Sequence, residues 1–458
     1  MVRDMTSGKP LRLITSFSLP LIIGNVFQQM YSMVDTIIVG KFLGNAALAA
    51  VGATGSITFL IIGFINGVAE GSCILVAQYF GSGDRKNLKR CVGNIIYVSI
   101  LLVAIMTIVA LWVNEPLLKL MQTPDDIIED AKAYLDVIYA GMFATMLYNV
   151  LAGLLRALGD SRSPLYFLLI ASVLNIVLDI YFIVGLNAGV AGAAYATVIS
   201  QLVSAICCFI YILKKCEPLR LGREDMKIRP YLIGRICLMG IPMALQYSVT
   251  AVGSVILQSA VNPLGSDAVA AISVGSKILN MSWAIINSIG VAIANFCGQN
   301  IGAGRLDRVR SGVRSGSLVV GVITVIFTLG LFFFGVSLSV LFLEEGSSDE
   351  VPMLIDRFMK IQAPFLIALA LIGIFRNTIQ GMGYSLQAMA AGLFELVGRS
   401  FVALMFVGQF GYDAVCIASP VAWMLADALL VPLYFWMIHR IKKLHPQWAL
   451  PPEKRTVP

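Results

Sequence analysis

The chain has 458 residues, of which 58% are hydrophobic and only 13% are charged, and its formal net charge is +7. Soluble globular proteins carry about 25% charged residues, so this composition excludes a water-soluble enzyme. One large buried core is also excluded, because single cores stop growing near about 250–300 residues and a larger one would still need polar surface to cover it. Most of the chain must therefore face lipid or other helices within a membrane.

Long charge-free stretches recur throughout the sequence, and a helix of about 20 apolar residues is enough to cross a bilayer. Divided at turn signals such as Gly185 to Gly189, they predict twelve membrane-spanning helices at residues 12–39, 46–79, 91–114, 133–156, 163–185, 189–213, 234–261, 268–300, 314–342, 353–381, 386–408 and 414–438. The first stretch contains Pro20 and Asp35 and no small-residue cleavage site, so we expect it to remain as a helix rather than to be removed as a signal peptide. The predicted fold class is all-α and integral to the membrane.

The charges in the loops predict which side of the membrane each loop faces. An even number of spans places both termini on one side, and the loops on that side hold 25 of the 33 lysine and arginine residues, among them Arg156. The opposite side holds five, together with acidic loops at residues 125–130 and 344–350. Because basic residues concentrate in cytoplasmic loops, we expect both termini on the cytoplasmic side of the cell membrane. The net charge therefore indicates topology, and we expect no nucleic-acid partner.

The two halves of the sequence resemble one another at a nearly constant offset. Residues 221 to 224 positions apart match repeatedly, at pairs that include Pro20 with Pro242, Gly44 with Gly265, Asn66 with Asn287, Gln78 with Gln299, and Gly159 with Gly383. We therefore predict two six-helix bundles that share one orientation in the membrane. They form an N-terminal lobe over residues 1–214 and a C-terminal lobe over residues 234–440, with a cytoplasmic linker over 215–233 and a cytoplasmic tail over 441–458.

The residue types that usually build metal centres and active sites are scarce or scattered. The eight cysteines show no repeated spacing, and the only two histidines, His439 and His445, lie in the C-terminal tail. We therefore expect no cofactor, no resident metal and no catalytic residue. Two like-oriented bundles suit a cleft that opens alternately to either side, whereas channels more often assemble from identical subunits around a pore. The sequence favours a monomeric transporter that is surrounded by the lipid bilayer.

Eight of the charged residues within the predicted spans are embedded at membrane depth, where a charge is expensive unless it is paired or faces water. They are Asp35, Glu70, Asp179, Lys277, Arg376, Glu395, Arg399 and Asp427. Counted at 1.5 Å per residue, Asp35, Asp179 and Thr197 all lie roughly 8–12 Å below the outer ends of their spans. Tyr31 is one helical turn from Asp35, and Asn175 is one turn from Asp179. We therefore predict that these five residues share one polar pocket in the first lobe.

Such a pocket could serve two chemistries. Burial and a neighbouring negative charge both favour the protonated form of a carboxylate, so the pocket could bind and release protons near neutral pH. An oxygen-rich set could alternatively hold Na⁺, a hard cation, at Asp35, Asp179, Asn175 and Thr197. The remaining alternative is that the two acids are helix-end residues that face interfacial water.

A second group of charges is expected in the C-terminal lobe. Glu395 and Arg399 are one turn apart, and Arg376 lies on the preceding span near a comparable depth. The group is either a structural ion cluster or part of a substrate or gating site. The sequence assigns no role to the other three embedded charges, Glu70, Lys277 and Asp427.

Pro20 lies 15 residues before Asp35 on the same predicted span. Proline removes a backbone hydrogen bond and weakens a helix at that point. A change of charge at Asp35 could therefore be converted into bending of the span. The alternative is that Pro20 marks a static kink.

These residues make the sequence resemble the multidrug and toxic compound extrusion family, and within it the DinF-like branch. The resemblance covers nearly the whole chain and rests on Phe17-Ser18-Leu19-Pro20-Leu21, on Val34-Asp35-Thr36 with Val39-Gly40, on Ala77-Gln78 with Gly81-Ser82-Gly83, and on Arg156-Ala157-Leu158-Gly159-Asp160. In similar proteins the coupling cation binds at positions that correspond here to Asp35, Asn175, Asp179, Tyr31 and Thr197. The proline implicated in helix bending corresponds to Pro20.

The resemblance implies an antiporter that exports varied, mainly lipophilic or cationic small molecules in exchange for H⁺ or Na⁺, by alternating access of two lobes. Other branches place coupling carboxylates on the seventh span, where this chain has only Gln246 and Gln258, so coupling is expected in the first lobe. Gln246 joins Arg376, Glu395 and Arg399 as a candidate for substrate binding or gating. The alternatives are a lipid-linked oligosaccharide flippase of the same superfamily, which the two arginines keep open, and an integral-membrane enzyme.

Overall fold

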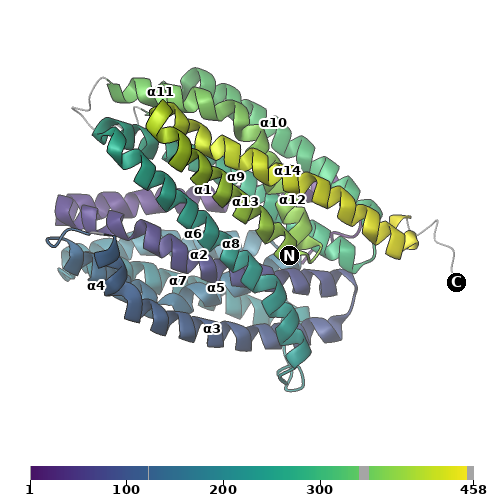
Figure 1. Cartoon of the computed structure of the whole chain (residues 1–458). Helices are drawn as coiled ribbons and strands as arrows, with labels where there is room; N and C mark the ends of the chain where they lie inside the picture. Colours follow the sequence, from purple (N-terminus) through teal and green to yellow (C-terminus); the bar gives the residue numbers. More distant parts are fainter. Residues whose placement is uncertain (1, 122, 340–349, 451–458) are drawn as a thin grey trace. The chain divides into compact units, whose positions relative to one another are not determined.

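The computed structural model describes residues 2–121, 123–339 and 350–450, and these are built of helices (Figure 1). In the first half of the chain they are α1 (Pro10–Leu43), α2 (Asn45–Gly81), α3 (Arg85–Leu120), α4 (Ile128–Ala140), α5 (Met142–Ala157), α6 (Arg162–Ile180) and α7 (Gly189–Lys215). In the second half they are α8 (Pro230–Val261), α9 (Ser266–Gly302), α10 (Leu306–Ser339), α11 (Glu350–Gln362), α12 (Leu366–Gly381), α13 (Ser385–Phe410) and α14 (Tyr412–Leu444). The end of the predicted span 314–342, the acidic residues Glu344 and Glu345, and residues 451–458 of the predicted tail lie outside the described residues.

Membrane-spanning helices account for nearly all of this structure. In the described part of the chain, 11 helical segments are long and apolar enough to cross a membrane, and the pair α4 and α5 supplies up to one more span, bent by 46°. Each segment overlaps one of the twelve spans that the sequence predicts. The predicted fold class, all-α and integral to the membrane, is confirmed.

Two of the predicted spans are broken within their length. The span predicted at 133–156 divides at Gly141, where a Cβ atom would lie 2.2 Å from Val198 Cγ2, so only glycine lets α7 approach this closely. The span predicted at 353–381 divides at a 3-10 turn (Ala363–Phe365), because Pro364 has no backbone N–H to continue the helical hydrogen bonds. The two breaks lie about one repeat length apart in the sequence and belong to the same position in the repeat.

The chain packs as two compact units that exchange the starts of two helices. The first unit contains the residues before Met5 together with Leu19–Ser248, and the second unit contains Met5–Ser18 together with the residues from Val249 onward. The start of α1 therefore belongs to the second unit, and the start of α8 belongs to the first. The lobes predicted from the sequence keep every helix whole, so they differ from these units at both exchanged segments.

Polar contacts fix both exchanged segments. In the second unit, Met5 is buried, its backbone N–H donates to Gln299 Oε1 at 2.8 Å, and its carbonyl accepts from Asn300 Nδ2 at 3.1 Å. In the first unit, the segment before α8 is held by the backbone N–H of Arg229, which donates to Asn94 Oδ1 at 2.9 Å. Each exchanged helix is thus anchored just before its first turn.

Glycines that repeat between the halves stand where the backbone turns left-handed. Gly44 and Gly265 have φ values of 88° and 101°, and Gly159 and Gly383 have φ values of 84° and 95°. Side chains strongly disfavour this region, whereas glycine adopts it readily. The turns between helices therefore explain why the repeat has glycine at these positions.

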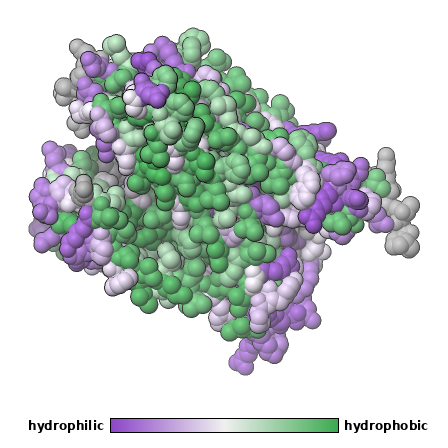
Figure 2. Space-filling model, viewed as in Figure 1, coloured by the Kyte–Doolittle hydropathy of each residue, from purple (hydrophilic) through white to green (hydrophobic). Residues whose placement is uncertain are grey.

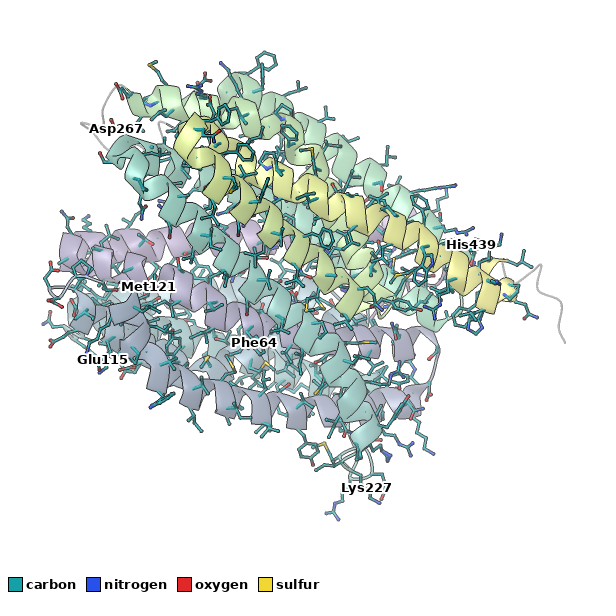
Figure 3. The ribbon with its side chains drawn as sticks, in the orientation of Figure 1. Phe64, Glu115, Met121, Lys227, Asp267 and His439 are labelled. Carbon is teal, nitrogen blue, oxygen red and sulfur yellow. The ribbon has the colours of Figure 1, made fainter. Side chains whose placement is uncertain are left out.

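The helices expose large apolar side chains, as a lipid environment requires. On α3, Leu101, Ile108 and Trp112 are 64%, 69% and 81% exposed. On the face in view, hydrophobic residues cover the middle of the helices and hydrophilic residues gather at their ends (Figure 2). In the first unit, Glu115 and Lys227 lie at opposite ends of the helices (Figure 3). The chain is a multi-pass membrane protein.

Candidate functional site

A tight turn brings α6 and α7 side by side in the first unit. After α6, one turn of π-helix (Tyr181–Gly185) leads into a short connection with Asn187 at a φ of 50°, and α7 begins at Gly189 with a φ of 61°. The chain reverses there, and α7 returns along α6. As a result Asn175 Nδ2 donates to Thr197 Oγ1 at 3.5 Å, although the two residues are 22 positions apart in the sequence.

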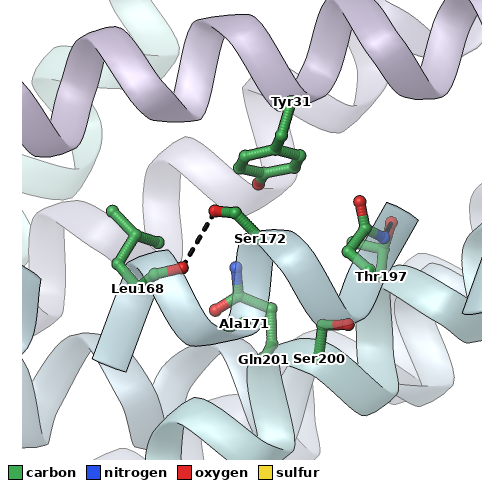
Figure 4. Close-up of a pocket in the computed structure, with 8 residues that line it drawn as sticks. Tyr31, Leu168, Ala171, Ser172, Thr197, Ser200 and Gln201 are labelled. Carbon is green, nitrogen blue, oxygen red and sulfur yellow. Dashed lines mark hydrogen bonds between the residues drawn. The ribbon is translucent and has the colours of Figure 1, made fainter. Parts of the chain in front are cut away.

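These side chains line a small polar pocket of about 10 Å³ (Figure 4). Tyr31 reaches it from α1, and Thr197, Ser200 and Gln201 reach it from α7. A cavity of roughly 10–15 Å³ is the space that one water molecule needs. The pocket therefore has room for one water molecule or one small cation.

The carboxyl groups of Asp35 and Asp179 do not line this pocket, but they lie close to each other and to Tyr31, which does. Asp179 is 0% exposed, and the hydroxyl of Tyr31 is close enough to interact electrostatically with both acids. The structure therefore brings together in one unit the five residues that the sequence places in one pocket. Whether they bind a coupling cation stays a prediction.

Several oxygen atoms of this group lack hydrogen-bond donors. Among the described residues, Asp35 Oδ1, both carboxylate oxygens of Asp179 and Asn175 Oδ1 are buried and accept no hydrogen bond. A buried acceptor without a donor costs about 1–3 kcal/mol, and more if it is charged. Two ionised carboxylates cannot bond to each other, whereas a shared proton or one cation would satisfy both. An all-oxygen set also suits a hard cation such as Na⁺.

Two residues near this group were not predicted from the sequence. Gln201 follows Thr197 by one turn on α7, and its Oε1 is also buried without a donor, so the same helical spacing could have selected it. Tyr134 of α4 interacts electrostatically with Asp35. No sequence signal relates α4 to this pocket, because that approach depends on how α4 packs against α7.

A larger cavity of about 340 Å³ lies inside the first unit and shares Tyr31, Thr197 and Gln201 with the small pocket. Cavities of about 300–1,000 Å³ typically hold drug-sized ligands. Pro20 lines this cavity, and so does Arg156. Arg156, which we count among the loop charges at the end of the predicted span 133–156, lies instead in the last turn of α5, which continues to Ala157.

In the second unit, Arg376 of α12 and Glu395 of α13 form a buried ion pair. Arg399 is also buried, and its Nη1 lies 3.1 Å from the position that a Cβ of Gly253 would take on α8. Gln246 belongs to the first unit. The structure therefore pairs two of the four predicted substrate or gating residues, and their roles stay predictions.

Repeated helical units, a buried group of oxygen ligands and an adjoining cavity together define a multi-pass membrane transporter. The MatE family model matches residues 20–181 and, a second time, residues 242–405. The two matches begin at Pro20 and Pro242, the same pair that opens the internal repeat. The chain belongs to the MatE family.

Individual proteins and structures agree with this assignment. The chain is 29% identical to the probable multidrug resistance protein YpnP of Bacillus subtilis (strain 168), over 89% of this chain and 92% of that protein. It is 28% identical to the probable multidrug resistance protein YoeA of the same organism, over 84% of each. A crystal structure of MATE in complex with MaL6 superposes with a TM-score of 0.90 at 24% identity, covering 96% of this chain and 99% of that chain. The predicted family, and a transporter rather than an enzyme, are confirmed, whereas the DinF-like branch stays a prediction.

Proposed function

We propose that this protein is a monomeric antiporter of the cell membrane that exports lipophilic or cationic drugs in exchange for H⁺ or Na⁺. The names of the relatives, probable multidrug resistance proteins, support drug efflux. The concentration of basic residues in the loops on the side of the termini supports a cytoplasmic location for both ends. The cavity of the first unit has the size that a drug requires.

The coupling cation binds at Asp35 and Asp179, with Asn175, Thr197 and Tyr31 around it. The observation that carries this proposal is the group of buried oxygens that accept no hydrogen bond. A proton or Na⁺ removes the cost of leaving them unsatisfied. Because a ligand shifts a conformational equilibrium only through its different affinities for the two states, the cation must bind more tightly to the state that releases the drug.

Pro20 connects this site to movement of the two units. Along α1, residues up to Ser18 belong to the second unit and residues from Leu19 onward belong to the first, so the change of unit falls next to Pro20. Proline removes a backbone hydrogen bond, which lowers the cost of bending the helix there. Occupation of Asp35, further along the same helix, then changes the bend at Pro20 and the access to the cavity.

Transport by purified protein in liposomes tests this function. We would follow ethidium, a fluorescent organic cation, while imposing a proton gradient and a Na⁺ gradient separately. Wild-type protein and Asp126→Asn, which removes an exposed acid of the same unit, should both transport the dye under one of the gradients. Asp35→Asn and Asp179→Asn should lose the gradient-driven component.

Two results would contradict the proposal in different ways. Gradient-driven transport that survives both Asp35→Asn and Asp179→Asn would show that the coupling site is wrong. If the wild-type protein moves no organic cation but moves a lipid-linked oligosaccharide, the substrate class is wrong and the flippase alternative holds.

A further inference from the structure

Glu70 and Arg156 face the 340 Å³ cavity from two packed helices of the first unit, α2 and α5. The register of these helices is fixed at two points: Asn149 Nδ2 donates to Asn66 Oδ1 at 2.8 Å, and the Sγ of Cys73 donates to the carbonyl of Val150 at 3.8 Å. From the first contact to the second, the residue number rises on both helices, so the helices run parallel. Averaged over the two contacts, the backbone of Arg156 lies about six residues, ~9 Å, beyond the level of Glu70, and its long side chain spans part of that distance.

These two opposite charges are neighbours that do not pair. The Arg156 guanidinium is close enough to act on Glu70 electrostatically. In the described part of the chain, however, no ion pair joins the two, and the Arg156 guanidinium donates no hydrogen bond. Arg156 therefore places a positive charge inside the helical bundle. An embedded charge of this kind is expensive unless it meets a counter-charge or water.

Glu70 is held in place at the wall of the cavity by Tyr247. Its Oε2 accepts a hydrogen bond from the hydroxyl of Tyr247 at 3.2 Å, in the part of α8 that belongs to the first unit. Tyr247 itself is held by packing, because its ring meets Phe59 at a centroid distance of 6.5 Å. The carboxylate therefore has a fixed direction, and its other oxygen is available to a second donor.

We propose that this cavity prefers substrates that carry both a positive and a negative group. The carboxylate of Glu70 binds the N–H groups of the positive end, and the guanidinium of Arg156 binds a carboxylate at the negative end, which it can accept through two parallel hydrogen bonds. The inference rests on the proposed function, since it takes this cavity as the substrate site. A purely cationic drug would satisfy Glu70 but leave Arg156 without a counter-charge.

Two related dyes test this preference directly. Rhodamine 110 carries a cationic ring system with N–H donors and a free carboxylate, and rhodamine 123 is its methyl ester, which lacks the negative charge. Binding of each dye to the purified protein is measured by fluorescence anisotropy. A hydrogen-bonded charge pair is typically worth about tenfold or more in affinity, so the wild-type protein should bind rhodamine 110 at least about tenfold more tightly than rhodamine 123.

Three variants separate the two contacts. Arg156→Gln should lower the affinity for rhodamine 110 by about tenfold and leave the affinity for rhodamine 123 nearly unchanged, which removes the preference for rhodamine 110. Glu70→Gln should weaken both dyes. The matched control is Arg162→Gln, which removes an exposed arginine at the start of α6 that does not line the cavity, and it should keep the wild-type preference. Because the readout is a ratio of two affinities on one preparation, a misfolded fraction cancels.

The inference is overturned if wild-type protein binds both dyes equally, if it does not bind rhodamine 110, or if Arg156→Gln weakens both dyes to the same extent. Uptake of the dyes into liposomes under proton or Na⁺ gradients distinguishes this failure from failure of the proposed function. Equal affinities with gradient-driven uptake would overturn only the preference for zwitterions. A preference for rhodamine 110 without any gradient-driven uptake would overturn only the transport function.

Discussion

The exchange of α8 into the first unit makes a specific prediction at Gly67. A Cβ atom at this position of α2 would lie 2.5 Å from Ala244 Cα, 2.6 Å from Ala244 N and 2.7 Å from the carbonyl carbon of Met243. All three are backbone atoms of α8, so no side chain can rotate away. Ordinary contact begins near 3.4 Å, and Gly67→Ala must therefore push the two helices apart by up to about 1 Å or distort one of them.

Overpacking of this kind typically costs about 1–3 kcal/mol. For a unit of 150–250 residues, each kcal/mol lowers the unfolding midpoint by about 2–4 °C. The matched control is Gly55→Ala on the same helix, because nothing lies within 4 Å of its Cβ position. Alanine favours a helix over glycine by about 0.5–1 kcal/mol, so this control should be neutral or slightly stabilising.

Thermal unfolding of the purified variants in detergent, followed by tryptophan fluorescence, measures the difference between them. Gly67→Ala should melt several degrees below the wild-type protein, and Gly55→Ala should not. If the two variants melt together, the first half of α8 does not pack against α2 at Gly67, and the exchanged arrangement of the first unit is wrong.

Two further predictions concern stability. Asp84 Oδ1 caps α3 by accepting from the backbone N–H of Asn87 at 3.0 Å, and this hydrogen bond holds the pKa of Asp84 below its usual value. Asp84→Ala should lower the free energy of unfolding by about 0.5–2 kcal/mol at pH 7. Because the folded-state pKa of Asp84 is depressed, the ionised side chain stabilises the fold only above the unfolded pKa of about 3.9, so the difference in melting temperature should shrink as the pH falls below about 4. A difference that grows in acid would contradict this. Arg376→Met should lower the free energy of unfolding by about 3–5 kcal/mol, because it leaves the Glu395 carboxylate buried without this partner. The double variant Arg376→Met with Glu395→Met should recover much of that stability. A double variant that melts below the single one would argue against the buried pair.

The coupling-site candidates show which contacts helical spacing alone can predict. Asp35, Asp179 and Thr197 could be placed at one depth because the ends of their spans are visible in the sequence and each residue adds a fixed rise. The same spacing rule could have found Gln201, one turn from Thr197. It could not find Tyr134, because its helix approaches Asp35 only through packing. The depth of a residue along its helix follows from counting residues, whereas the side of the pocket from which it approaches depends on how the helices pack.

Arg156 shows where this method fails. In the sequence it stands at the end of an apolar run among basic residues, which is typical of a cytoplasmic loop. In the structure it occupies the last turn of α5 and lines the cavity that also contains Glu70. The predicted span 133–156 ends at Arg156 and α5 ends one residue later, so Arg156 stands at the boundary between these two environments. Element boundaries are the least certain part of any sequence prediction.

The sequence by itself determined the membrane class, the number of spans, the repeat and the identity of the buried acids. These follow from properties of contiguous residues, namely apolar length, loop charge and a constant offset between matching positions. The tertiary structure alone decided that the starts of α1 and α8 are exchanged between units, that two spans break at Gly141 and Pro364, and that Glu70 and Arg156 share one cavity. Those features depend on which helices meet and how closely, and that is set by packing between residues far apart in the chain.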